Sequence, residues 1–402
     1  MNWLFKWTKG DAVIWAVVIL LSIFGVLAVY SSTGTLAYQK HGGNTEFFLF
    51  KHLAFLLFGL TLLYMSHLIN YKYYSRISQI LLIVSFILLP YTLFFGTEIN
   101  SARRWITLPV IGFTFQTSDL AKLALIMYIA RFLSRRQDDI KDFKKSFLPL
   151  TITIATICAL IMPANLSTAL VLFATCLLLM FIGRIAFKHI LLVVGAGILA
   201  ATVMVVMVLS LPDESVEKIA RLSTWKSRVE SFISNEEYAN EREALQKDYH
   251  VVQGKIAVAS GGILGKGPGN STQRNFLPNP FSDFVFAIII EEYGLVGAIF
   301  LIALYLVLLF RCIRIVIKSP RAFGALLAVG LSFSLVIQAF INMGVAVNIF
   351  PVTGLPLPLV SMGGTSLIFT SLSLGIILSV SRHIEEQENP EQLEEGGNIA
   401  TA

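Results

Sequence analysis

Three carboxylates lie close together where the chain becomes continuously apolar. The stretch NPFSDFVFAIIIEEYGLVG, residues 279–297, has Asp283 at the beginning of an apolar run and Glu291 and Glu292 inside it. A charge at bilayer depth costs roughly 2.5–3.5 kcal/mol on insertion scales, so acids within spans usually face a protein interior or a wet cavity and pair with cations. The stretch therefore predicts an outward-facing polar cleft with Asp283 at its mouth.

A second interpretation of this stretch is helix capping. Ser282 or Asp283 would accept backbone N–H bonds, and a negative charge suits the positive end of a helix. Capping does not account for Glu291 and Glu292, which would lie about 12–14 Å further along a helix. Both interpretations of Asp283 remain open from the residues alone.

Two cationic stretches offer partners for such acids. NSARRWITL places Arg103, Arg104 and Trp105 on a predicted outer loop, and QTSDLAKLALIMYIARFL places Lys122 just inside a predicted span. The first is also typical of an interfacial anchor, with basic and aromatic groups at headgroup level. Lys122 also fits a side chain that extends its ammonium group outwards to water.

Two irregular segments complete the predicted outer surface. Residues 261–269 are rich in glycine but match neither phosphate-loop pattern, so we interpret them as a tight turn that returns the chain to the membrane. Residues 348–366, NIFPVTGLPLPLVSMGGTS, cannot form a regular lipid-facing helix. Irregular backbone at this depth must line protein or water, which makes this segment a predicted wall of the cleft.

The elements that position these residues are predicted to be membrane helices. The 402 residues are 55% hydrophobic and 14% charged, with a mean hydropathy of +0.73. Soluble domains carry about 25% charged residues, which excludes a soluble enzyme. Apolar runs of about 20 residues fit a bilayer core. We predict an all-α polytopic protein with ten transmembrane helices, near residues 12–31, 48–67, 77–95, 117–133, 147–163, 165–183, 188–211, 284–310, 322–346 and 364–382.

Residues 1–382 are thus predicted to form a single ten-helix membrane domain. A large extracytoplasmic loop, about 212–283, would join helices 7 and 8, and residues 383–402 would form a disordered acidic cytoplasmic tail. The fifth and sixth runs are separated only by MPAN, so one long span is an alternative there.

The distribution of Lys and Arg predicts the orientation. Alternate short loops are rich in them, which places both termini in the cytoplasm of a multi-pass inner-membrane protein. The net charge of +6 is accounted for by this bias, so no nucleic-acid surface is implied. We expect the first apolar run to be an uncleaved span, because no small-residue cleavage site follows it.

The metal-binding and redox residue types are sparse. The six histidines are scattered without an HExxH pattern, and the sequence shows no metal site. The three cysteines lie within or at the end of predicted spans and are interpreted as inert packing residues: Cys158, Cys176 and Cys312.

Five ordered blocks of the sequence resemble the SEDS family of shape, elongation, division and sporulation proteins, which includes FtsW and RodA. The blocks are ARRWI, QTSDLAKLA, YHVVQGKIAVASGGILGKGPGNSTQ, FLPNPFSDFVFAIIIEEYGLVG and PVTGLPLPLVSMGGTSL. Two stretches, FQTSDLAKLALIMYIARFL, which contains the second block, and PANLSTALVLFA, look more like the division member than the elongation member.

The resemblance implies a peptidoglycan glycosyltransferase that polymerises glycan strands from lipid II at the outer face of the cytoplasmic membrane. It also implies a class B penicillin-binding protein as partner, other divisome proteins, and a role in septal synthesis during division. A divalent cation, Mg²⁺ or Mn²⁺, is expected from family behaviour, with no organic cofactor.

The site residues follow from the same resemblance. Asp283 falls on the family's catalytic acid and would act as general base on the acceptor 4-hydroxyl of lipid II. Arg104 and Lys122 would hold diphosphate, with Arg221 as a further candidate. Glu291 and Glu292 match the family's Glu-Glu and would shape the cavity or form ion pairs rather than take part in the chemistry. The remaining positions assigned to the cleft by the resemblance are Gln253 and Ser361.

This sequence departs from the family at two places. Many members have an acid before the sixth span, where PANLSTAL supplies Asn165. The segment before the catalytic acid is usually more polar, with Glu and His, whereas here it is NPFSD. The ionic role of the first acid cannot be transferred to Asn165, and a His-assisted base is not supported.

Three other functions compete with septal polymerisation. A lipid II flippase also fits ten spans with intramembrane acids, although transporters tend to place their sites near the midplane at broken helices. A scaffold for division proteins would make Asp283 a helix cap only. The elongation polymerase would share the reaction and differ in its partners.

Overall fold

A helix occupies the position of each predicted span. The computed structural model describes residues 9–34, 36, 44–99, 102–108, 113–210, 249–277 and 280–388. The helices are α2 (Ala12–Ser32), α4 (Thr45–Leu68), α5 (Tyr71–Phe95), α6 (Thr117–Arg135), α7 (Leu148–Ile161), α8 (Leu166–Ile182), α9 (Phe187–Ser210), α14 (Val285–Lys318), α15 (Ala322–Ala346) and α16 (Gly364–Glu388). A π-helical turn, Phe143–Phe147, leads into α7.

The described residues confirm an α-helical membrane fold. Eight helical segments are long and apolar enough to cross a bilayer; α8 is apolar but shorter, and α6 is not among the eight. The count of ten crossings therefore stays a prediction, as does the large loop, because residues 211–248 lie outside the described residues. The predicted tail overlaps the end of α16 up to Glu388, and residues 389–402 also lie outside the described part.

Short polar residues begin several of these helices. Asp11 accepts the backbone N–H groups of Val13 and Ile14 at the start of α2. Asn44 and Asn70 cap α4 and α5 in the same way. Each cap satisfies backbone donors that have no partner within the helix, so these residues define where the apolar runs become helical.

The beginning of α2 and the ends of α14 and α16 meet at one end of the bundle. Arg311 of α14 pairs with Asp11 at 2.6 Å, and the backbone N–H of Asp11 donates to Ser381 Oγ at 3.0 Å. Lys318, the last residue of α14, pairs with Glu388 at 3.1 Å. The N-terminal end of α2 and the C-terminal ends of α14 and α16 thus lie on the same side of the bundle.

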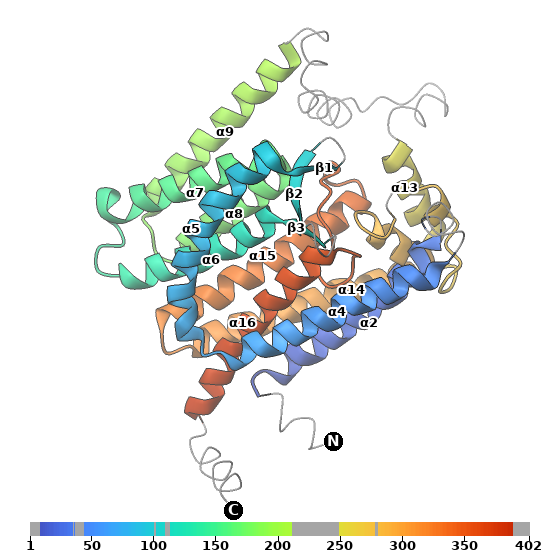
Figure 1. Ribbon diagram of the computed structural model, residues 1–402, viewed down its shortest axis with the longest axis horizontal. Coiled ribbons are helices and arrows are strands. Elements are labelled where there is room, and N and C mark those ends of the chain that lie inside the picture. Colours follow the sequence, from blue (N-terminus) through green and yellow to red (C-terminus); the bar gives the residue numbers. More distant parts are fainter. Residues whose placement is uncertain are drawn as a thin grey trace, which may run out of the picture.

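The opposite end carries elements that are not membrane helices (Figure 1). Strands β1 (Thr97–Ile99), β2 (Ala102–Leu108) and β3 (Phe113–Gln116) form an antiparallel sheet in the order β1-β2-β3. Helix α13 (Tyr249–Gly261) packs on α14 near this end. Our sequence interpretation treated residues 103–105 as loop; pairing of Trp105 with Gln116 makes them part of a strand.

Helices α15 and α16 form the centre of the bundle. Both are largely buried, α15 between α14, α6 and α8, and α16 along α4. Helix α9 is the least buried of the candidate spans, and it leans away from the others in Figure 1. Polar side chains on α15 are therefore held inside the protein rather than in lipid.

Candidate active site

Asp283 lies on the short segment that leads into α14. The helix begins at Val285 with Phe284 at the N-cap position, so neither Ser282 nor Asp283 occupies that position. The Asp283 side chain is partly exposed, and its Oδ1 accepts a hydrogen bond from Ser282 Oγ at 2.9 Å. A partly exposed carboxylate at the end of a bundle has the access that a general base requires.

The backbone around Asp283 is anchored from two other parts of the chain. Asn342 Nδ2 of α15 donates to the Asp283 carbonyl at 3.0 Å. Ser361 Oγ donates to the Ser282 carbonyl at 2.7 Å, and the Met362 N–H donates to the Phe281 carbonyl at 2.9 Å. These contacts restrict the position of the carboxylate although it precedes the helix.

The irregular segment 348–363 lies beside Asp283. A Cβ atom built on Gly354 would be 3.7 Å from Asp283 Oδ2, and Gly354 has a positive φ of 69°. The Ser361 hydroxyl accepts from the Leu357 N–H at 2.8 Å as well as donating to Ser282. Ser361 is buried, so its hydroxyl joins two backbone segments rather than facing a ligand.

Lys122 of α6 faces α15. Its Nζ donates to Gln338 Oε1 at 2.8 Å and lies 3.5 Å from Asp119 Oδ1. It lines a small cavity between α6, α15 and α16, whose other polar lining residues are Asp119, Ser334, Ser366, Thr370 and Ser373. Lys122 therefore faces an internal polar cavity and does not extend away from the protein.

Arg104 of β2 lines a second small cavity. Its polar neighbours there are Thr92, Arg103, Thr117 and Ser118. Both cavities include the first turns of α6, but Arg104 and Lys122 do not line the same one. The sequence grouped these two cations around one diphosphate, and the structure places them in separate cavities.

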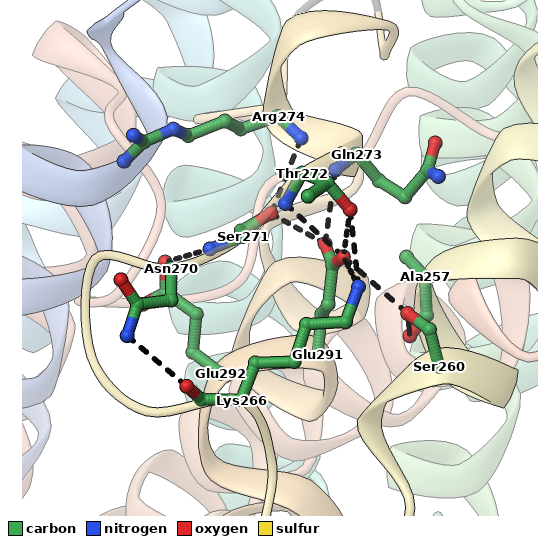
Figure 2. Close-up of polar contacts among 10 residues, drawn as sticks. All are labelled: Ala257, Ser260, Lys266, Asn270, Ser271, Thr272, Gln273, Arg274, Glu291 and Glu292. Carbon is green, nitrogen blue, oxygen red and sulfur yellow. Dashed lines mark hydrogen bonds and ion pairs between the residues drawn. The ribbon is translucent and has the colours of Figure 1, made fainter.

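Residues 260–274, which include the glycine-rich loop, lie against Glu291 and Glu292 (Figure 2). Glu291 is 0% and Glu292 1% exposed, so neither faces an open cleft. Lys266 Nζ lies 2.6 Å from Glu291 Oε1. The other groups that donate to the Glu291 carboxylate are Ser260 Oγ, Ser271 Oγ, the Thr272 N–H and Oγ1, and the Gln273 N–H.

Glu292 connects the same loop to α2. Its Oε1 accepts from Ser31 Oγ of α2 and from the Ser271 N–H at 3.3 Å. Arg274 Nη1 donates to the Ser31 carbonyl at 3.1 Å. The two glutamates thus hold residues 260–274 against α14 and α2.

Gln253 and Arg221 are the remaining residues of the predicted site. Gln253 is buried on α13, where its neighbour Gly254 lies against the ring of Phe284. Arg221 lies outside the described residues. Sequence reasoning did not single out Lys266, which alternates with glycines in a predicted turn, nor Gln338 and Asn342, two amides four residues apart in an apolar run.

Asn165 has a local role in this chain. Its Oδ1 accepts from the Thr168 N–H at 3.2 Å at the start of α8. The position that carries an acid in many family members is therefore a helix cap here.

The described residues do not supply a dedicated metal site. Within them, no three His, Cys, Asp or Glu side chains lie close enough to hold a metal ion. The divalent cation expected from family behaviour therefore has no resident cage of protein ligands among the described residues.

Fold and site together define a polytopic membrane protein with an anchored carboxylate at the end of the bundle opposite the beginning of α2. Residues 11–386 match the FtsW/RodA/SpoVE family, described as cell cycle proteins. The chain belongs to this family, and it is a peptidoglycan glycosyltransferase.

Curated relatives match over almost the whole chain. Stage V sporulation protein E of Bacillus subtilis is 32% identical over 382 residues, covering 94% of this chain and 98% of the relative. A probable peptidoglycan glycosyltransferase FtsW of Trichlorobacter lovleyi is 32% identical, covering 94% of each. These relatives include both sporulation and FtsW proteins.

Solved structures share the fold. A chain from a study of a peptidoglycan synthase complex, on structural coordination of polymerization and crosslinking, has a TM-score of 0.69 at 27% identity, covering 93% of this chain and 98% of that chain. Thermus thermophilus RodA, a rod shape determining protein, has a TM-score of 0.65 at 25% identity, covering 94% and 98%. The match confirms the RodA-like fold.

Proposed function

We propose that this chain polymerises glycan strands from lipid II at the outer face of the cytoplasmic membrane, with Asp283 as general base. The observation that carries the base assignment is the anchoring of Asp283, whose carboxylate is partly exposed while its backbone is held by Asn342. The relatives named peptidoglycan glycosyltransferase support the reaction class.

The proposed step needs one proton acceptor. The acceptor 4-hydroxyl loses its proton to Asp283 as its oxygen attacks the anomeric carbon of the donor, and the bond from that carbon to the diphosphate breaks. Displacement at one face inverts the anomeric carbon. Diphosphate leaves as an anion, so a second carboxylic acid is not needed to protonate it, unlike in glycosidases.

Cations are proposed to meet the charge of the diphosphate. A positioned cation stabilises the negative charge that develops on a leaving group. Lys122 is the better supported partner, because its hydrogen-bonding neighbour Gln338 contacts the segment beside Asp283. Arg104 and Arg221 are proposed from the family resemblance. A divalent cation is proposed to arrive with the diphosphate, whose oxygens are suitable hard ligands.

The partner and cellular role are proposals of the same kind. The chain from the peptidoglycan synthase complex supports a class B penicillin-binding protein as partner, because its study concerns coordinated polymerization and crosslinking. Septal synthesis with other divisome proteins is supported by the cell cycle family and the FtsW relatives. The RodA likeness makes elongation the competing role.

The test is strand synthesis from labelled lipid II by purified protein with its cognate transpeptidase and divalent cation. Wild type, Asp283→Asn and Glu98→Gln would be compared; Glu98 is an exposed carboxylate on β1 and serves as the matched control. We expect strands from wild type and Glu98→Gln and none from Asp283→Asn.

Either of two results would redirect the assignment. Near-normal strands from Asp283→Asn would remove Asp283 from the role of base. Absence of strands from every protein, with lipid II translocation measurable in liposomes, would favour the flippase.

A further inference from the structure

Two buried amides of α15 connect the cation and the carboxylate of the proposed site. Gln338 is 3% and Asn342 1% exposed. They are four residues apart, about one helical turn, so they lie on the same face of α15. This face is directed at the irregular segment 348–363, which it contacts at Leu355 and Pro356.

Each amide binds that segment and one proposed site residue. Gln338 accepts from Lys122 Nζ at 2.8 Å and donates through Nε2 to the Pro356 carbonyl at 2.8 Å. Asn342 Nδ2 donates to the Leu355 carbonyl at 2.7 Å and to the Asp283 carbonyl at 3.0 Å. Leu355 and Pro356 are consecutive, so the four bonds form one short path from Lys122 to Asp283.

The bonds to the segment are expected on general grounds. Residues 351–357 form neither helix nor strand, and buried backbone carbonyls need partners from elsewhere. Hydrogen bonds to the Leu355 and Pro356 carbonyls do not, however, require that the same amides also bond Lys122 and Asp283. Both donors of the Asn342 amide group are used, and its Oδ1 lacks a hydrogen-bond partner among the described residues.

We propose that Gln338 and Asn342 are positioning residues that set the separation between Lys122 and Asp283. The inference rests on the proposed function, in which Lys122 holds diphosphate and Asp283 takes the proton. Asn342 acts on the backbone of Asp283 and so on the approach of base to hydroxyl. Gln338 holds the Lys122 ammonium group, which without this acceptor would move closer to Asp119. Gln338 therefore affects the binding of the diphosphate.

The two residues should therefore affect different kinetic constants. A misplacement of about 1 Å can cost roughly a hundredfold in rate, so Asn342→Leu should lower kcat by ~100-fold with KM for lipid II changed less than about threefold. Gln338→Met should raise KM about tenfold with a smaller change in kcat, because it removes uniform binding of the diphosphate. Both replacements keep the approximate volume of the side chain.

The experiment is steady-state strand synthesis from labelled lipid II by the full chain with its cognate transpeptidase. Asn342→Asp is added as an isosteric variant that lacks both N–H donors and should lower kcat like Asn342→Leu. Ser332→Ala is the matched control, since Ser332 is buried on α15 and its hydroxyl donates to the Val329 carbonyl of its own helix and hydrogen-bonds Cys312 of α14. Thermal unfolding of each protein is recorded in parallel.

Lowered kcat in both Asn342 variants, with raised KM in Gln338→Met, supports the proposal. Wild-type kcat and KM overturn it, whether or not the unfolding temperature falls, because a merely structural role moves stability alone. If Asn342→Leu and Gln338→Met are not recovered folded, the kcat of Asn342→Asp is the test: a lowered kcat supports the proposal and a wild-type kcat overturns it. Asp283→Asn is measured in the same assay. Glycan strands formed by that variant would refute Asp283 as the general base, independently of the result for Gln338 and Asn342.

Discussion

Lys266 and Glu291 form an ion pair at the point where α14 is interrupted. The Nζ–Oε1 distance is 2.6 Å, and the Glu291 side chain is completely buried whereas that of Lys266 is 31% exposed. Three residues further on, Gly294 leaves helical geometry with φ 66° and ψ −165°. The Lys266 N–H also donates to the Glu291 carbonyl at 2.9 Å, so backbone and side chain bind the same residue.

The first prediction concerns this ion pair. Lys266→Ala should lower the free energy of unfolding by about 1–3 kcal/mol, because the buried carboxylate loses its cation but keeps its hydroxyl and backbone donors. In a double-mutant cycle with Glu291→Gln, the two losses should be less than additive. Thermal unfolding in detergent measures both.

The control is an exposed pair. Lys145 and Asp139 lie 3.2 Å apart with both side chains about half exposed. Lys145→Ala should change the free energy of unfolding by less than about 1 kcal/mol. Equal losses at Lys266 and Lys145 would contradict a special contribution of the buried pair.

A second prediction concerns the break in α14. A Cβ atom on Gly294 would overlap the Ile263 carbonyl and the Gly265 nitrogen, and its φ lies in the left-handed region. Gly294→Ala should therefore displace the 262–267 loop and lower the unfolding temperature strongly. Gly195→Ala in α9 is the matched control, because no atom lies within 4 Å of its Cβ position. It should be neutral or stabilise by about 0.5–1 kcal/mol.

Asn165 provides a third prediction. Asn165→Ala removes the cap of α8 and should lower the free energy of unfolding by about 1 kcal/mol, whereas Asn165→Asp keeps an acceptor at the positive helix end and should be neutral or stabilising. Strand synthesis by Asn165→Asp should equal that of wild type. A large gain in synthesis would show that an acid at this position has a role beyond capping.

The fourth prediction concerns Ser361. Ser361→Ala removes the acceptor of the buried Leu357 N–H and the donor to the partly buried Ser282 carbonyl, and it leaves both groups without that partner. We expect a loss of about 1–3 kcal/mol and a lower rate of strand synthesis, because the segment before Asp283 is released.

Ser85→Ala is the comparison for Ser361. Ser85 is equally buried, but its hydroxyl bonds the Leu81 carbonyl within its own helix, so its removal should leave the rate of synthesis unchanged. If Ser361→Ala also synthesises strands at the wild-type rate, the Ser361 hydroxyl does not position Asp283.

The sequence by itself determined the helices and the entry to the site. A bilayer requires apolar runs of about 20 residues, so the helix positions can be recognised locally, and Asp283 is recognisable because it precedes such a run. The family blocks identified the enzyme class for the same reason, since they are local patterns in a fixed order.

Only the tertiary structure decided which polar groups meet. Lys266 reaches Glu291 across 25 residues, and Lys122 reaches Gln338 across 216. The sequence offered Arg104 and Lys122 as equivalent cations, whereas packing of α5 and α15 around α6 puts them in separate cavities. Periodicity inside uniformly apolar helices does not show which face is buried, so these pairings depend on how the helices pack.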